Sequence, residues 1–330
     1  MRLLRLALLL SAAFVAAPPA VTAADLDPAR PGPDARVGVF YYPWFATPAR
    51  DGRYLHWQQG GSLPPRDVAS SFYPARGVYS SADVLVVDAQ LREIAAAGIG
   101  SVITSWWGRG SLEDRRLPLL LETAARHGLQ VAAHLEPYGG RTIESTGDDI
   151  EYLRGLGITD FYIWASVALP DAGWADLNLR LDGVRTFANT NLVGRAAAGG
   201  FDGLYTYDVL LFDGRLFPRL CAQARRLGLL CAPSVGPGYD ARRATPDRRV
   251  KPRRNGARYD EMWLGAVRAR ADLVTITSYN EWHEGTQIEP AQSGRRGYLS
   301  YDGAWGRSGR PAETAYLDRT AYWVQRLRRR

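Results

Sequence analysis

Apolar and polar positions along the chain predict short strands that alternate with amphipathic helices. Apolar residues 37–42 form the first predicted strand, which Pro43 ends, and residues 83–97 have the three- to four-residue apolar spacing of a helix. This alternation continues as far as residue 277. Strands are predicted at 37–42, 100–105, 130–134, 160–164, 183–187, 201–207, 229–232 and 272–277, and helices at 83–97, 117–127, 150–156, 193–198, 216–227 and 258–270.

Eight strands that alternate with helices predict an α/β fold, a single (β/α)8 TIM barrel with long strand-to-helix loops. The strand at 183–187 has the weakest pattern of the eight. No change of composition interrupts residues 37–330, so we expect one catalytic domain there. Residues 24–36 are rich in proline and lack periodicity, which predicts a linker before that domain.

Residues 1–23 have the features of a secretory signal peptide. Arg2 and Arg5 form a basic start, residues 6–17 are apolar, and residues 21–23 are small enough for a cleavage site. We therefore expect a secreted, extracellular protein without stable membrane insertion after cleavage. Retention of the segment as an uncleaved anchor is the alternative.

Composition and charge add few constraints to this interpretation. The chain has 330 residues and a net charge of +7, which comes from arginine almost alone because Lys251 is the only lysine. We find no nucleic-acid-binding motif, expect a monomer, and expect the basic end at 326–330 to be solvated and frayed.

Cys221 and Cys231 are the only cysteines, and the sequence is compatible with either a disulfide or two buried thiols.

Unusual polar and aromatic residues follow the predicted strands directly. The ten Trp and 17 Tyr are compatible with either sugar-binding platforms or an aromatic core. In a TIM barrel the carboxyl ends of all strands lie on one face, so residues placed there converge on one cleft. The residues concerned are Tyr41, Tyr42, Trp44, Trp106, Trp107, His134, Glu136, Tyr205, Tyr207, Tyr239 and 280–284.

The richest of these segments is 275–290, which follows the last predicted strand. Glu281 and Glu284 are the best candidates for the carboxyl pair that a glycosidase needs, with Glu136 as a third carboxylate opposite. We expect Glu289, beside Pro290, to be structural. The spacing alone does not assign separate roles to the two glutamates.

Other chemistries have no matching pattern. The sequence has no His-x-x-x-His motif or Cys pair suited to zinc, no Gly-x-Ser-x-Gly elbow, and no phosphate loop or dinucleotide fingerprint. We therefore expect neither a metal nor a cofactor. The glycine-rich segment 233–238 does not open a helix and is better explained as a rigid loop beside the cleft.

Several of these segments together resemble glycoside hydrolase family 99, the endo-α-1,2-mannosidases and endo-α-1,2-mannanases. The resemblance extends from about residue 37 to residue 290, and its last motif is the most specific. Its motifs are FYYPW at 40–44, HW at 56–57, SWWG at 105–108, HLEPY at 134–138, FDGLYTY at 201–207, PSVGPGY at 233–239 and ITSYNEWHEGTQIEP at 276–290.

The resemblance implies a retaining endo-hydrolase that cuts α-1,2-mannosidic bonds within mannan or a mannose-rich glycan. It further implies that Glu281 deprotonates the 2-hydroxyl of the sugar, which attacks the anomeric carbon to give a 1,2-anhydro sugar. Glu284 would act as general acid and then as general base. In this mechanism neither carboxylate forms a bond to carbon.

The resemblance also implies a set of substrate-binding residues. Trp107 stands where the mannanases are expected to carry tryptophan, which favours mannose over glucose in the subsite beyond the cut. Residues 242–252 fit the family pattern poorly, which affects the arginine assignment and the leaving-side subsites. The expected binding residues are Tyr41, Tyr42, His56, Trp106, Trp107, Glu136, Tyr205, Tyr207, Arg253, Asn280, Trp282 and His283.

Two alternatives to this function remain. One is a barrel that binds carbohydrate without turnover, although binding alone does not require the intact Glu281/Glu284 pair. The other is a barrel hydrolase that acts on a different polysaccharide.

Overall fold

The computed structural model of the protein describes residues 32–329. The predicted signal peptide at 1–23 and residues 24–31 of the predicted linker lie outside this range. Strand β1 (Asp34–Tyr41) begins three residues before the predicted strand, because the backbone N–H of Asp34 donates to the carbonyl of Gly98 at 2.9 Å. The last residues assigned to the linker therefore belong to the barrel.

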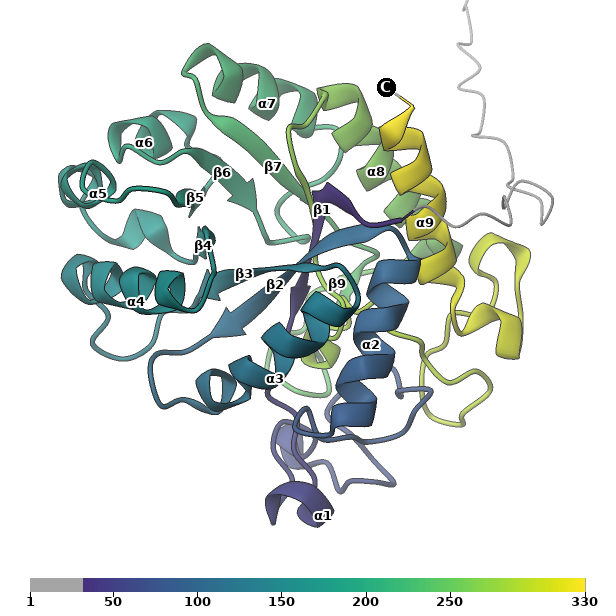
Figure 1. Cartoon of the computed structure of the whole chain (residues 1–330). Helices are drawn as coiled ribbons and strands as arrows, with labels where there is room; N and C mark the ends of the chain where they lie inside the picture. Colours follow the sequence, from purple (N-terminus) through teal and green to yellow (C-terminus); the bar gives the residue numbers. More distant parts are fainter. Residues whose placement is uncertain (1–31, 330) are drawn as a thin grey trace, which may run out of the picture.

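Eight parallel strands form a closed barrel, which confirms the predicted (β/α)8 architecture (Figure 1). The weakly patterned strand at 183–187 is present as β5, which pairs in parallel with both of its neighbours. In order around the barrel the strands are β1, β10 (Val274–Ile276), β7 (Leu230–Val235), β6 (Gly203–Thr206), β5 (Arg185–Asn189), β4 (Asp160–Ile163), β3 (Gln130–Leu135) and β2 (Ile99–Trp106).

The helices form a layer outside the barrel, as Figure 1 shows. Short 3-10 turns η2 (Gln59–Gly61), η3 (Ser166–Ala168), η4 (Arg254–Gly256), η5 (Trp282–Glu284), η6 (Ala304–Gly306) and η7 (Arg310–Ala312) occur in the connections. The helices are α1 (Pro48–Asp51), α2 (Val84–Ala96), α3 (Leu112–Arg126), α4 (Ile143–Gly155), α5 (Asp171–Asn178), α6 (Val193–Ala198), α7 (Phe217–Arg226), α8 (Ala257–Ala269) and α9 (Ala315–Arg328).

Two predicted helices begin earlier in the structure than their apolar spacing indicated. Helix α3 starts at Leu112 because Ser111 caps it, and the Ser111 hydroxyl accepts a hydrogen bond from the backbone of Asp114. Helix α4 starts at Ile143 because Thr142 and Ser145 form a reciprocal capping box. In both helices the polar first turns hid the start from an analysis of apolar spacing.

The prediction of a frayed basic end is wrong. Residues 315–328 form helix α9, which packs beside α8 and α2 and buries Tyr316, Leu317, Trp323, Val324 and Leu327 (Figure 1). Its Arg328 lies 3.2 Å from the carboxylate of Asp34 at the start of β1. The C-terminal helix therefore covers the strands where the barrel closes.

Aromatic side chains fill much of the interior, so the core takes up half of the tryptophans that the composition left unassigned. Half of the ten tryptophans are fully buried in the core, and Trp107 is an exception at 38% exposed. Inside the barrel the ring of Phe40 lies 4.8–5.9 Å, centroid to centroid, from the rings of His134, Tyr162, Tyr205 and Tyr207. The buried tryptophans are Trp57, Trp106, Trp174, Trp263 and Trp282.

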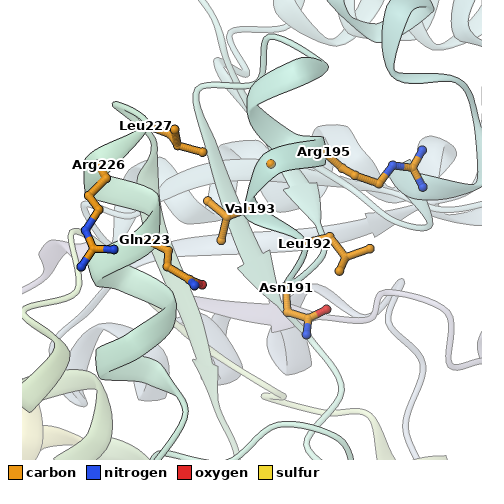
Figure 2. A pocket seen from close by; sticks show the side chains of 8 residues that line it. Asn191, Leu192, Val193, Arg195, Gln223, Arg226 and Leu227 are labelled. Carbon is orange, nitrogen blue, oxygen red and sulfur yellow. The ribbon is translucent and has the colours of Figure 1, made fainter.

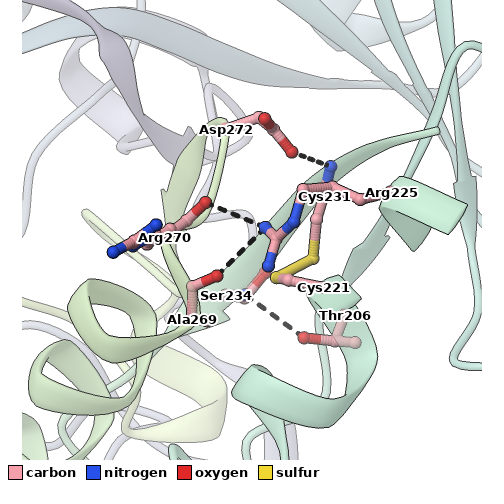
Figure 3. Close-up of a disulfide and its surroundings, with 8 residues drawn as sticks. All are labelled: Thr206, Cys221, Arg225, Cys231, Ser234, Ala269, Arg270 and Asp272. Atoms are coloured by element: carbon pink, nitrogen blue, oxygen red, sulfur yellow. Dashed lines mark hydrogen bonds between the residues drawn. A yellow bond between two sulfur atoms is a disulfide. The ribbon is translucent and has the colours of Figure 1, made fainter. Parts of the chain in front are cut away.

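Cys221 of α7 and Cys231 of β7 form a disulfide (Figure 3). The sequence had been compatible with either this bond or two buried thiols. Both residues are fully buried. Beside the bond, Arg225 donates to the backbone carbonyls of Ala269 and Arg270 at the end of α8. The disulfide and these hydrogen bonds tie α7 to β7 and α8.

Two long connections cover the end of the barrel at which the strands finish. The first lies between β1 and α2 and carries α1, and the second lies between β10 and α9 (Figure 1). They contact each other through bridges that pair Phe72 with Leu299 and Pro74 with Ala291. Within the described residues, no helix is long and apolar enough to cross a membrane.

Candidate active site

The segment that follows β10 folds back on itself and places Glu281 and Glu284 on one turn. The Ser278 hydroxyl accepts a hydrogen bond from the backbone of Glu281 at 2.8 Å, and the Ser278 N–H donates to the carbonyl of Thr286 at 3.0 Å. Gly285 closes the turn with φ +64°, and any Cβ there would lie 2.9 Å from the carbonyl oxygen of Asp240. This position therefore requires glycine, both for its backbone angle and for its contact.

Two tyrosine hydroxyls from other strands meet at Glu281. The Tyr207 hydroxyl, which follows β6, donates to the Glu281 carboxylate, and it also hydrogen-bonds the hydroxyl of Tyr42, which follows β1. Only 8% of Glu281 is exposed. Hydroxyl donors stabilise the ionised form of a carboxylate, so this surrounding suits a group that works as a base.

Burial and neighbouring negative charges raise the pKa values of both glutamates. Burial is the largest cause at Glu281 and the negative charge of Glu284 is the next, while the bonds to Tyr207 and Tyr42 oppose them. At Glu284, burial and the charges of Asp208 and Glu136 raise the pKa to about 7. Two close carboxyl groups of this kind titrate as a pair and retain a proton near neutral pH, as general acid catalysis requires.

The third carboxylate, Glu136, belongs to a polar chain on the opposite side of the barrel. Ser105 donates to it at 2.8 Å, and Nε1 of Trp107 donates to the same Ser105 hydroxyl at 3.1 Å. His134 Nδ1 lies 3.1 Å from Glu136, and its Nε2 is 2.8 Å from the Tyr205 hydroxyl. The buried Tyr205 thus contacts Glu136 only through His134. Trp107 is held at the surface by its hydrogen bond to Ser105.

His56 and His283 form an aromatic wall together with Trp44. The rings of His56 and Trp44 stack at 4.4 Å with an interplanar angle of 8°, and the His283 ring lies 5.3 Å from that of His56. Burial, together with the neighbouring His283 and Arg116, lowers the pKa of His56 to about 3. Burial likewise lowers the pKa of His283 to about 4, so both rings are neutral at neutral pH.

Several predicted binding residues do not reach this group of side chains. Tyr41 points outward and donates to Gln90 of α2 at 2.7 Å, while Trp106 donates to Asp114 of α3 at 3.0 Å. Asn280 binds the backbone N–H and carbonyl of Tyr42, at 2.8 and 3.0 Å, and so holds that strand end in place. These three side chains support the site instead of lining it.

Trp282 and Glu289 belong to a buried network behind the catalytic turn. The Trp282 indole donates to Glu289 at 2.7 Å, and Glu289 also accepts from Arg76, Gln90 and Tyr79, each at 2.8 Å. Glu289 is fully buried, so it cannot meet a substrate. These contacts agree with the structural role expected for it.

Arg253 also points to the catalytic turn from behind. Its Nη2 donates to the carbonyls of Gly285 and Gln287, at 2.9 and 2.7 Å. Its guanidinium lies over the rings of Phe72, Tyr301 and Tyr316 at 4.5–4.7 Å. Through Nη2, Arg253 thus holds the residues that follow Glu284.

The sequence reasoning missed some side chains around the pair. Trp44 was noted only as a strand-end aromatic, and Asp208 and Asp247 were not considered, although both raise the pKa of Glu284. Ser105 was part of a quoted motif but had no role assigned. Their positions were the available signal: Ser105 lies at the end of β2, Trp44 and Asp208 follow β1 and β6, and Asp247 lies in the loop at 242–252.

A hollow of about 590 Å³ lies elsewhere, between α6 and α7 in the outer helix layer (Figure 2). It is lined from α6 and the residues before it, and from the end of α7. None of the carboxylates discussed above borders it. Its lining residues are Asn191, Leu192, Val193, Gly194, Arg195, Gln223, Arg226 and Leu227. The hollow is thus separate from the glutamate pair.

Known proteins resemble this chain over nearly the whole described range. A glycoprotein endo-alpha-1,2-mannosidase-like protein of Danio rerio is 32% identical over 89% of this chain and 79% of its own length. A glycoprotein endo-alpha-1,2-mannosidase of Xenopus laevis is 31% identical over 82% of this chain and 73% of its own.

A solved structure agrees with these relatives. The GH99 endo-alpha-mannosidase from Bacteroides thetaiotaomicron superimposes with a TM-score of 0.81 at 30% identity, covering 90% of this chain and 98% of that one. The sequence profile of Glycosyl hydrolase family 99 matches residues 33–329. The protein is therefore a glycoside hydrolase, and it belongs to glycosyl hydrolase family 99.

Proposed function

We propose that this protein is a secreted, retaining endo-α-1,2-mannosidase or mannanase that cuts internal bonds of mannan or a mannose-rich glycan. The observation that carries the proposal is the single turn bearing Glu281 and Glu284, with two tyrosine hydroxyls directed at Glu281 alone. The names of the relatives and of the solved structure support mannose as the sugar. Membership of the family favours turnover over binding alone.

The proposed reaction has two steps. In the first, Glu281 takes the proton of the sugar 2-hydroxyl, whose oxygen attacks the anomeric carbon, while Glu284 protonates the glycosidic oxygen as its bond to that carbon breaks. In the second, Glu284 takes a proton from water, which opens the 1,2-anhydro sugar at the same carbon, and O2 regains its proton from Glu281. Two inversions at one carbon give net retention.

The surroundings of the two glutamates support this division of roles. Burial and the charge of Glu284 raise the pKa of Glu281 well above its usual range, and the tyrosine hydroxyls oppose this rise and stabilise the carboxylate that a base needs. The pKa of about 7 at Glu284 suits a group that gives up a proton in one step and takes it back in the next. No metal or cofactor takes part in the proposed steps.

Export and sugar preference are further parts of the proposal. The signal-like segment at 1–23 supports export, and so does the buried disulfide, because such bonds persist mainly in oxidising compartments. We also propose that Trp107, half-exposed and held by Ser105, favours mannose over glucose in the subsite beyond the cut.

Digestion of an α-1,6-mannan that carries α-1,2 branches tests the proposal. We expect the wild type to release oligosaccharides, and Glu281→Gln and Glu284→Gln each to lower kcat by at least about 100-fold, the usual scale of general acid–base catalysis. Melting curves of both variants check that they fold. Full activity in either variant contradicts the assigned pair. An inverted anomer among the first products, followed by NMR, contradicts the anhydro-sugar step.

A further inference from the structure

The loops beside Glu284 carry an uneven distribution of charge. Three segments meet there: the loop at 66–70, the β8–β9 hairpin, in which β8 (Tyr239–Asp240) pairs with β9 (Val250–Lys251), and the loop at 295–298. We call their arginines the basic rim. Its members are Arg66, Arg242, Arg243, Arg248, Arg249, Arg295 and Arg296.

Direct contacts hold the three segments together. Arg243 of the hairpin donates to Asp67 at 3.4 Å, to the carbonyl of Ser70 at 3.3 Å and to that of Gly297 at 3.0 Å. Arg295 donates to the carbonyl of Arg66 at 3.0 Å. The three segments that carry the seven arginines are therefore joined to one another.

The rim holds most of the excess charge of the described chain. Residues 32–329 contain 37 Lys and Arg and 32 Asp and Glu, an excess of five. The three segments contain seven arginines and Lys251 against three aspartates, Asp67, Asp240 and Asp247, an excess of five. The remainder of the described molecule is thus close to neutral.

The aspartates of these segments are already paired, which leaves several arginines available. Asp240 binds Arg242 at 2.8 Å, Asp247 binds Arg249 at 2.8 Å, and Asp67 binds Arg243. The side chains of Arg66, Arg248 and Arg296 are exposed and have no hydrogen bond or ion pair within residues 32–329. Arg295 also lacks a carboxylate partner there and stacks 3.5 Å over the ring of Tyr73.

The hairpin starts next to the proposed general acid. The backbone of Asp240 lies against Gly285, which directly follows Glu284. Tyr239 donates to Asp247 at 3.1 Å, and the charge of Asp247 acts on Glu284. The general acid protonates the leaving oxygen, so the departing sugar units begin beside Glu284, where the hairpin also starts.

We propose that the basic rim binds phosphate groups on the leaving-group side of the glycan, so that the preferred substrate is a phosphorylated mannan. This inference rests on the proposed function of the site, because it uses Glu284 as the acid. Guanidinium groups bind phosphate oxygens through paired N–H donors, and a phosphate offers enough oxygens for several arginines at once.

Binding to the inactive Glu284→Gln variant tests the proposal without turnover. Oligosaccharides from a mannan with mannosyl-phosphate groups are compared by calorimetry with the same material after removal of phosphate. We expect roughly three- to tenfold tighter binding of the phosphorylated form in low-salt buffer, the scale of one or two exposed charge contacts. The preference should disappear at about 0.5 M salt, where such contacts are screened.

A matched pair of variants locates the effect. Arg248→Gln with Arg296→Gln should abolish the preference for the phosphorylated form. Arg219→Gln with Arg268→Gln removes two exposed arginines of α7 and α8 and should leave it unchanged. An equal loss in both pairs, or equal affinity of the two forms for the starting variant, overturns the inference.

The outcomes separate this inference from the proposed function and from lipid binding. If the wild type cleaves dephosphorylated mannan but shows no phosphate preference, the rim proposal fails and the enzyme assignment stands. A phosphate preference without cleavage of either mannan supports the rim and contradicts the assignment. Sedimentation with phosphatidylglycerol vesicles tests lipid binding. If the protein binds these vesicles through the basic rim but shows no preference between the two mannans, the glycan proposal is overturned.

Discussion

Glu281 and Glu284 have the same side chain and lie three positions apart, yet the fold surrounds them differently. Glu281 receives two tyrosine hydroxyls, whereas Glu284 faces the negative charges of Asp208 and Asp247; the charge of Glu136 acts on both. The sequence predicted the pair from its spacing and assigned roles only through the family resemblance. The distinction depends on residues from other strands, which the local sequence does not contain.

The charge on Asp208 should set the upper pH limit of activity. Asp208→Asn retains an oxygen that can accept from the backbone of Leu210 and Leu211, but it removes a charge that raises the pKa of Glu284. Since the acid must be protonated, kcat falls as pH rises through its pKa. We expect the alkaline limb of the kcat–pH profile to move to lower pH by roughly half to one unit.

Asp182→Asn is the control for this experiment, because Asp182 is exposed between α5 and β5 and its loss changes net charge equally. Its profile should match that of the wild type. A shift of the Asp208→Asn limb toward higher pH contradicts the assignment of Glu284 as the group that must be protonated.

Arg253 should act on the chemical step through the catalytic turn. Lysine lacks the planar fork that spans the Gly285 and Gln287 carbonyls, so Arg253→Lys should loosen the residues after Glu284. We expect kcat to fall about tenfold, equivalent to about 1.4 kcal/mol, with KM nearly unchanged. Arg254→Lys, at the exposed neighbouring position, should behave as the wild type. A raised KM with unchanged kcat indicates instead that Arg253 binds substrate directly.

Among the elements, strands were easier to predict than the starts and ends of helices. All eight barrel strands occur where apolar runs indicated them, because a strand buried on both faces is apolar throughout. Helices α1, α5 and α9 were missed, and α3 and α4 begin in polar turns that their caps stabilise. Local polar bonds, which apolar spacing does not register, determine those starts.

The disulfide between α7 and β7 should stabilise the fold without affecting catalysis. It closes a loop with a sequence separation of 10 residues, so replacing both Cys221 and Cys231 with alanine should lower the free energy of unfolding by about 2–3 kcal/mol. Thermal melts measure this difference. Activity at 25 °C should persist, because the bond lies behind β7 and not at the strand ends (Figure 3). An unchanged melting temperature contradicts the expected contribution.

On the scale of the whole molecule, α9 closes the barrel between its first and last strands. It buries Trp323, Val324 and Leu327 and carries Arg319, which binds Asp260 of α8 at 2.6 and 2.7 Å. Its Arg328 reaches Asp34 at the start of β1. The helix thus links the two ends of the described chain.

Truncation after Thr314 should prevent the protein from folding. It removes α9 and exposes the apolar surfaces of α2 and α8. Burial of each large apolar side chain contributes about 1.5–3 kcal/mol to the stability of the fold, and the truncated chain loses several such contributions. We expect insoluble protein without a cooperative melt in circular dichroism. A chain that ends at Arg328 serves as the control and should melt like the full chain. Cooperative melting of the shorter chain contradicts this role of α9.

The sequence by itself determined the eight-stranded barrel, the face that bears the chemistry, and the glutamate pair, because apolar periodicity and strand-end position are local properties of the chain. It did not determine which neighbouring side chain enters the barrel. Tyr42 and Tyr207 reach Glu281, whereas Tyr41 and Trp106 point to the outer helices. Side chains alternate along a strand, but only the closed barrel decides which set faces inward. The unequal surroundings of the two glutamates and the convergence of the basic rim likewise arise from contacts between segments far apart in the chain.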